Sequence, residues 1–216
     1  MNNNNQPFTE EQLDFISEMM NIGAGNAATA LQQMLQCPVN LIIPRVHVIP
    51  VTHVPTTFDN PASPVICVKM RMVGDVGGGL FFIVPEEHKD GLVSLVKRAT
   101  PGLSQLENQR PDEMGLSALT EIGNILGGTY LTAIHDFCGL NIYHTVPILA
   151  IDMIQSLLDE ALVRLSLQVQ TALLIENEFI VEKGRIRTFL LLIPAAESIE
   201  ALVNSLEKAR KAYVSA

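Results

Sequence analysis

A glutamate followed three residues later by an asparagine occurs twice in similar surroundings, as Glu18 with Asn21 and as Glu121 with Asn124. A carboxylate is a negative acceptor, and a carboxamide both donates and accepts hydrogen bonds without changing charge. Two carboxylates can act together as a hydrolase pair. Nothing in the sequence places these two across one substrate, and the repetition favours a separate site for each.

Further polar and small residues extend each pair along one predicted helix. Positions i, i+4 and i+7 lie within about 60° of one another on a helix, so Asp14 shares a face with the first pair and Ser117 with the second. One turn further along these faces lie Gly25 and Gly128. Glycine inside a helix costs about 1 kcal/mol relative to alanine, which the close approach of another backbone would explain. More small residues stand beside them: Gly23, Ala24 and Gly127.

The alternative to a functional site is that the glutamates and asparagines lie on a solvated helix face, and that the glycines only let two helices pack closely. Sliding the sequence by 103 residues weakens that alternative, because eight of the 32 positions in residues 13–44 then match residues 116–147. Glutamate, asparagine and glycine are kept together in both copies, while most solvent-type positions between them differ. The matched pairs are Leu13/Leu116, Glu18/Glu121, Asn21/Asn124, Ile22/Ile125, Gly25/Gly128, Thr29/Thr132, Ala30/Ala133 and Pro44/Pro147. Internal duplication is the simplest explanation.

Each copy begins with a predicted helix that positions these residues. Thr9 and Gln12 have the spacing of a capping box, and apolar residues recur with helical period to Leu35. The second helix is predicted over about 112–137. A β-rich stretch, then a hairpin and a closing helix follow each one. These elements are predicted at 39–51, 65–73 with 80–84, and 86–99 in the first copy, and at 142–150, 172–181 with 186–193, and 195–212 in the second.

The copies differ most in their middle segments. Residues 52–64 read as a Pro-rich loop, whereas Ile151, Ile154, Leu157, Leu158, Ala161, Leu162 and Leu165 keep helical spacing. Each half is therefore predicted as α-β-X-β-β-α, with repeats at about 8–100 and 111–212. We expect residues 1–216 to form a single α+β domain with pseudo-two-fold symmetry and a central sheet flanked by helices.

Composition excludes several classes of function. The formal charge of −9 argues against a nucleic-acid partner, and polar residues interrupt the uncharged stretch 19–44 too often for a membrane span. The N-terminus has neither the basic residues nor the apolar run of a signal peptide. The three cysteines, with no Cys-x-x-Cys pair, are expected to be buried thiols in a reducing cytosol, so a cytoplasmic location is predicted.

The sequence argues against two kinds of ligand site. The five histidines lack metal-ligand spacing, so no bound metal is expected. Residues 23–28 formally satisfy a dinucleotide fingerprint. Its context is wrong, because those glycines continue a predicted helix instead of following a strand.

The pattern [Asp or Ser]-x-x-x-Glu-x-x-Asn with proline 23 residues after the asparagine occurs twice, ending at Pro44 and Pro147. It resembles the signature of the CheC/CheX/FliY phosphatases, over nearly the whole chain and including the duplicated layout. CheC is the nearest type within that family. The resemblance implies a CheC-like fold and a chemotaxis phosphatase, a hydrolase that removes the phosphoryl group from the aspartate of a CheY-type response regulator.

The resemblance also implies roles for single residues. Asn21 and Asn124 would orient an in-line water at the receiver's aspartyl phosphate, and Glu18 and Glu121 would pair with the receiver lysine. The remaining face residues, Asp14, Gly25, Ser117 and Gly128, would contact the receiver. No cofactor need bind this chain, because Mg²⁺ is expected in the receiver.

Two alternatives remain open. The first is a non-catalytic adaptor that binds a receiver or the deamidase CheD, which the family suggests as a further partner. The second is a component associated with the flagellar switch.

Overall fold

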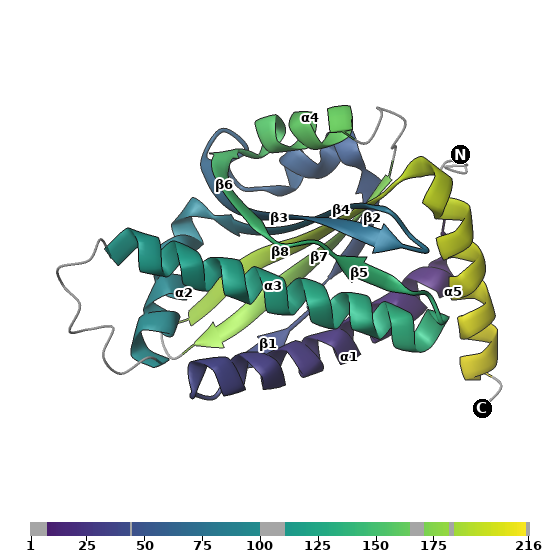
Figure 1. Ribbon diagram of the computed structural model, residues 1–216, viewed down its shortest axis with the longest axis horizontal. Coiled ribbons are helices and arrows are strands. Elements are labelled where there is room, and N and C mark those ends of the chain that lie inside the picture. Colours follow the sequence, from purple (N-terminus) through teal and green to yellow (C-terminus); the bar gives the residue numbers. More distant parts are fainter. Residues whose placement is uncertain (1–7, 44, 100–110, 165–170, 182–183, 215–216) are drawn as a thin grey trace.

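Two long helices cross one face of an antiparallel sheet in the computed structural model (Figure 1). The structure describes residues 8–43, 45–99, 111–164, 171–181 and 184–214. Pro44, Leu165, the turn at 182–183 and the ends of the chain lie outside the described residues, so the predictions made there are not compared below.

The first long helix, α1 (Glu10–Leu35), starts as its sequence predicts. The Thr9 hydroxyl accepts a hydrogen bond from the Gln12 backbone, and the Gln12 side chain accepts one from the Thr9 backbone, so the capping box is confirmed. The helix ends at Gln36, whose φ of 53° is left-handed. The second, α3 (Pro111–Cys138), is followed by Gly139 with a φ of 68°.

The described residues form one sheet of eight strands, and both predicted hairpins are confirmed. Its main path runs β1-β7-β8-β4-β3-β5, with β2 pairing beside β1 on β7 and β6 beside β5 on β3. The strands are β1 (Asn40–Ile42), β2 (Val46–Pro50), β3 (Pro64–Gly74), β4 (Gly78–Pro85), β5 (Ile142–His144), β6 (Ile148–Met153), β7 (Thr171–Val181) and β8 (Gly184–Pro194).

The two halves exchange their short strands. β1 and β2 of the first half pair with β7 of the second, while β5 and β6 of the second half pair with β3 of the first. The two hairpins meet at the centre, where β4 runs antiparallel to β8 with Phe81 opposite Leu191. This reciprocal pairing is the pseudo-two-fold arrangement predicted from the duplication, and it builds one sheet from both halves.

Side chains of the sheet alternate between two apolar layers. On β4, Leu80, Phe82 and Val84 face the layer that includes α1 and α3, whereas Phe81 and Ile83 face the opposite layer. Both layers are buried, so the central strands are covered on both faces. The first layer supports the helices that carry the Glu-x-x-Asn pairs.

The middle segments resemble each other more than predicted. Residues 51–57 form a 3₁₀ helix, η1 (Val51–Thr57), where a loop was expected. The corresponding α4 (Ile154–Arg164) begins 103 residues after η1 does. The helical assignment of Ile151 was wrong, because Ile151 pairs with Ile66 in β6 and is exposed. Both segments cover the face of the sheet opposite to α1 and α3 (Figure 1).

The closing helices are α2 (Glu86–Ala99) and α5 (Ile199–Val214), the latter preceded by the short 3₁₀ helix η3 (Ala196–Ser198). They also cross between the halves: α5 packs against the start of α1, and α2 against the start of α3, where Gly115 approaches Val93. Among the described helices, none combines the length and apolar character needed to cross a membrane.

Candidate functional site: two Glu-x-x-Asn faces

The first face lies on the side of α1 turned away from the sheet. Phe15, Ile16 and Met19 are buried against the core, so the opposite side of the helix points outward. This outer stripe is exposed along its whole length and consists of Asp14, Glu18, Asn21 and Gly25. The spacing recognised in the sequence therefore does form one continuous surface.

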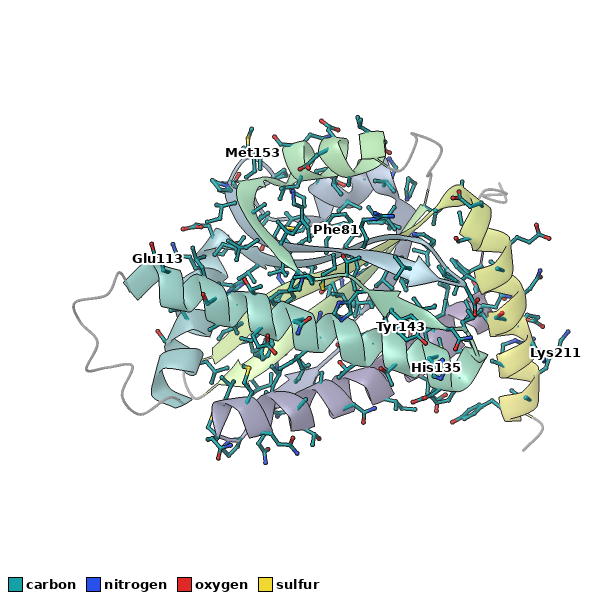
Figure 2. The ribbon with its side chains drawn as sticks, in the orientation of Figure 1. Phe81, Glu113, His135, Tyr143, Met153 and Lys211 are labelled. Atoms are coloured by element: carbon teal, nitrogen blue, oxygen red, sulfur yellow. The ribbon has the colours of Figure 1, made fainter. Side chains whose placement is uncertain are left out.

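The second face occupies the corresponding side of α3. Ser117 and Glu121 are exposed, whereas Asn124 and Gly128 are half-buried. Figure 2 labels Glu113 and His135 near the two ends of this helix, and the face lies between them. Neither asparagine is buried, so both carboxamides can meet a partner.

The contacts between the helices locate the two faces relative to each other. Phe15 packs edge-on against Phe137, and Gly23 lies beside Tyr130, so α1 and α3 run antiparallel. This alignment brings Gly25 level with Gly128, near the pseudo-two-fold axis. The two asparagines lie on opposite sides of that level, about 12 Å apart along the helices at 1.5 Å per residue. The faces are thus separate sites on one side of the molecule.

The glycines divide into two groups, which corrects one expectation. A Cβ at Gly25 would meet nothing within 4 Å, so this position is open to a partner. A Cβ at Gly23 would lie 2.7 Å from Tyr130 Cδ1, and one at Gly127 would lie 3.0 Å from Leu80 Cδ2. Gly23 and Gly127 are buried and serve the packing of the fold instead of clearing the outer faces.

The glutamates have different environments. The Tyr213 hydroxyl, from the end of α5, donates a hydrogen bond to Glu18 Oε1 at 2.7 Å. This bond, together with the negative charge of Glu18, raises the pKa of Tyr213. No side chain in the described part of the chain pairs with Glu121.

A histidine lies beside the second face, and the equivalent position of the first half is not a histidine. His144 Nε2 lies 3.3 Å from the place of a Cβ on Gly128, and His144 Nδ1 is 3.0 Å from the Thr145 carbonyl oxygen. The residue 103 positions earlier is Leu41, which is buried. His144 therefore places an imidazole beside the second face where the equivalent position of the first half has leucine.

Neither Tyr213 nor His144 was predicted from the sequence as part of a site. Tyr213 lies 195 residues from Glu18 in the chain, and no periodic pattern connects the two. The offset of 103 could have drawn attention to His144, because it aligns an imidazole with Leu41.

Two of the three thiols are poorly suited to act as nucleophiles. Burial raises the pKa of Cys67 to about 12 and that of Cys138 to about 11, so both are protonated near neutral pH. Only Cys67 is fully buried, which corrects the expectation for Cys37 and Cys138. No group of three or more His, Cys, Asp or Glu side chains suited to a metal occurs among the residues described. The dinucleotide fingerprint falls in the middle of α1, so its required strand is absent there.

Comparison with known proteins agrees with this duplicated geometry. Residues 11–47 and 114–151 each match the CheC-like family. The two matches begin 103 residues apart, and each contains one Glu-x-x-Asn pair. The curated protein "CheY-P phosphatase CheC" of Bacillus subtilis (strain 168) is 31% identical over 199 residues, covering 91% of this chain and 94% of that one.

Solved structures show the same fold. FliY of Thermotoga maritima has a TM-score of 0.68 at 20% identity, covering 94% of this chain and 98% of that one. FliM from a FliM–SpeE complex of H. pylori has a TM-score of 0.65 at 12% identity, covering 94% and 97%. At these identities the two structures support the fold alone.

Proposed function

The chain belongs to the CheC-like family, and we propose that it hydrolyses the aspartyl phosphate of a CheY-type response regulator in chemotaxis signalling. The relative that is 31% identical along nearly the whole chain is named a CheY-P phosphatase. The proposal places this activity in the cytoplasm, as expected from the sequence.

One observation carries the proposal. In both halves an accessible asparagine stands one helical turn beyond an exposed glutamate, on the outward side of its helix. A face of this kind, which lies on the outer side of a helix, suits docking to a second protein better than enclosing a small molecule, because small-molecule sites are concave and mostly apolar.

The proposed chemistry needs little from this chain beyond position. A water oxygen attacks phosphorus in line, the bond from phosphorus to the aspartyl oxygen breaks, and the products are inorganic phosphate and the free carboxylate. The receiver supplies Mg²⁺ and its own lysine, and no cofactor is assigned to this chain. Asn21 or Asn124 would hold the attacking water, since an amide can accept from water and donate at fixed geometry.

The other residues of each face would fix the docking register. Glu18 and Glu121 would each accept a hydrogen bond from the receiver lysine, whose charge they complement. Asp14 and Ser117 extend the contact by one turn. Gly25 and Gly128 would leave room for the receiver backbone, and the open space at Gly25 supports this role. CheD stays a prediction of the family resemblance.

Turnover separates an enzyme from an adaptor. Phosphorylated CheY-type receiver would be mixed with this protein at one-twentieth of its concentration, and release of inorganic phosphate would be followed with time. We expect many phosphates released per chain and a rate proportional to protein concentration. Unchanged decay, with receiver bound in proportion to added protein, would instead support the adaptor.

A further inference from the structure

The end of α5 makes a direct contact with the first face. Tyr213 is 47% exposed, and its ring packs against Phe15 and Phe137 with centroids 5.7 and 6.2 Å away. Its hydroxyl reaches Glu18 Oε1 at 2.7 Å. The ring is thus fixed by two neighbours from α1 and α3, while the hydroxyl fixes the glutamate.

Several contacts anchor the helix that carries this tyrosine. Leu206 is buried in the core, and Arg210 Nη1 lies 2.6 Å from Glu11 Oε2 on α1. Gln12 Nε2 donates to Glu207 Oε2 at 3.3 Å. The last turns of α5 are therefore tied to the first turn of α1, and the position of Tyr213 follows from these ties.

Among the residues that the structure describes, no tyrosine from α2 reaches the second face. α2 packs on α3 as α5 packs on α1: Leu92 and Leu206 are both buried, and Val93 approaches Gly115 where Glu207 meets Gln12. This alignment places Ala99 of α2 opposite Tyr213 in sequence. Alanine has no hydroxyl to donate, so the sequence gives α2 no side-chain hydrogen-bond donor at the position that Tyr213 occupies in α5.

We propose that Tyr213 is a positioning residue of the first site, which holds the Glu18 carboxylate ready for the receiver lysine; this rests on the proposed function. The hydroxyl occupies one carboxylate oxygen and leaves Oε2 free to accept from a cation. A glutamate that is already oriented loses less side-chain freedom on docking, so the receiver binds more tightly. The first site should accordingly have the lower KM of the two.

Tyr213→Phe is the direct test, because it removes the hydroxyl and keeps the ring against Phe15 and Phe137. It would be made in two backgrounds, Asn124→Ala, in which only the first site can work, and Asn21→Ala, in which only the second can. We expect KM to rise about three- to ten-fold in the first background, the size expected for losing one typical hydrogen bond at a partly exposed position, with kcat changed less than two-fold. In the second background neither constant should change.

A measurement without receiver checks the contact itself. The phenol pKa of Tyr213, followed by ring NMR signals, is raised by Glu18 and should fall toward its ordinary value in Glu18→Gln. An unchanged pKa would overturn the inference.

A lowered KM would show that the tyrosine competes with the receiver, and an equal change in both backgrounds would show a general effect on folding. Either result overturns the inference while leaving the proposed function intact. Absence of phosphatase activity in the unmodified protein would overturn both.

Discussion

The first Glu-x-x-Asn face is contacted at Glu18 by the C-terminal helix α5, whereas the second is approached at Gly128 by His144 of strand β5. Tyr213 holds Glu18 at the first face, and Gly25 is open. At the second face Glu121 is free of side-chain partners in the described chain, and His144 stands beside Gly128. The residues assigned to chemistry are the same in both copies, and the residues around them are not.

The core beneath the faces shows the same kind of divergence. Gly23 of α1 accommodates Tyr130 of α3, whose hydroxyl donates to buried Asn177. The positions related by the 103-residue offset hold Leu126 and Ala27, so a glycine faces a tyrosine in one place where leucine and alanine occur in the other. Large and small residues have been exchanged while the helices stay packed. Duplication thus preserved the outer stripes and let their support change.

The largest effect is expected when the two halves are produced as separate chains. We predict that residues 1–105 alone do not fold, because β1 and β2 would lose β7 and β4 would lose β8. Exposed edges of this length favour aggregation. Circular dichroism and chemical denaturation would show no cooperative transition in either half, and mixing residues 1–105 with residues 106–216 should restore one. A cooperative transition in an isolated half would mean that the repeats are independent units.

A smaller effect distinguishes glycines of the fold from glycines of the face. Gly23→Ala should lower the free energy of unfolding by about 1–3 kcal/mol, since the new methyl overpacks against a hydrogen-bonded Tyr130. Gly25→Ala should raise it by up to about 1 kcal/mol, because alanine is the better helix former and meets nothing. Denaturation would measure both, with receiver affinity measured in parallel.

The proposed docking role predicts weaker receiver binding for Gly25→Ala despite its greater stability. Gly23→Ala is the matched control, since its methyl points inward. Receiver affinity unchanged in Gly25→Ala would remove Gly25 from the docking surface.

The sequence predicted the parts of this molecule that depend on local pattern or on duplication. The capping box at Thr9, both hairpins and the two outer stripes follow from residue spacing. What it missed depends on contacts between distant segments. The pairing of β1 with β7 and the reach of Tyr213 to Glu18 arise only when the halves exchange elements. The 3₁₀ helix η1 was hidden by its prolines, which suggest a loop but fit tight turns.

The smallest predicted effect concerns the tie between α5 and α1. Hydrogen bonding from Arg210 is the main cause that lowers the pKa of Glu207 to about 2 from an ordinary 4.5. A carboxylate whose pKa is depressed in the folded protein stabilises the fold at pH values above its ordinary pKa. That contribution is lost as the pH falls toward 2. The melting temperature of Glu207→Gln should therefore lie slightly below that of the unmodified protein at pH 6, and the difference should shrink by pH 3. Glu200→Gln, an exposed change on the same helix, is the control, and a difference independent of pH would contradict this assignment.

The central claim is that each asparagine serves its own phosphatase site. Asn21→Ala, Asn124→Ala and the double variant would be compared for phosphate release from phosphorylated receiver at low molar ratio, with receiver binding measured alongside. Removing a positioned polar group of this kind costs about 10² to 10³ in rate at the substituted site. Each single variant should therefore keep only the activity of the other site. The double variant should fall close to the receiver's own decay while still binding it. Near-normal turnover by the double variant would contradict the claim and favour the adaptor.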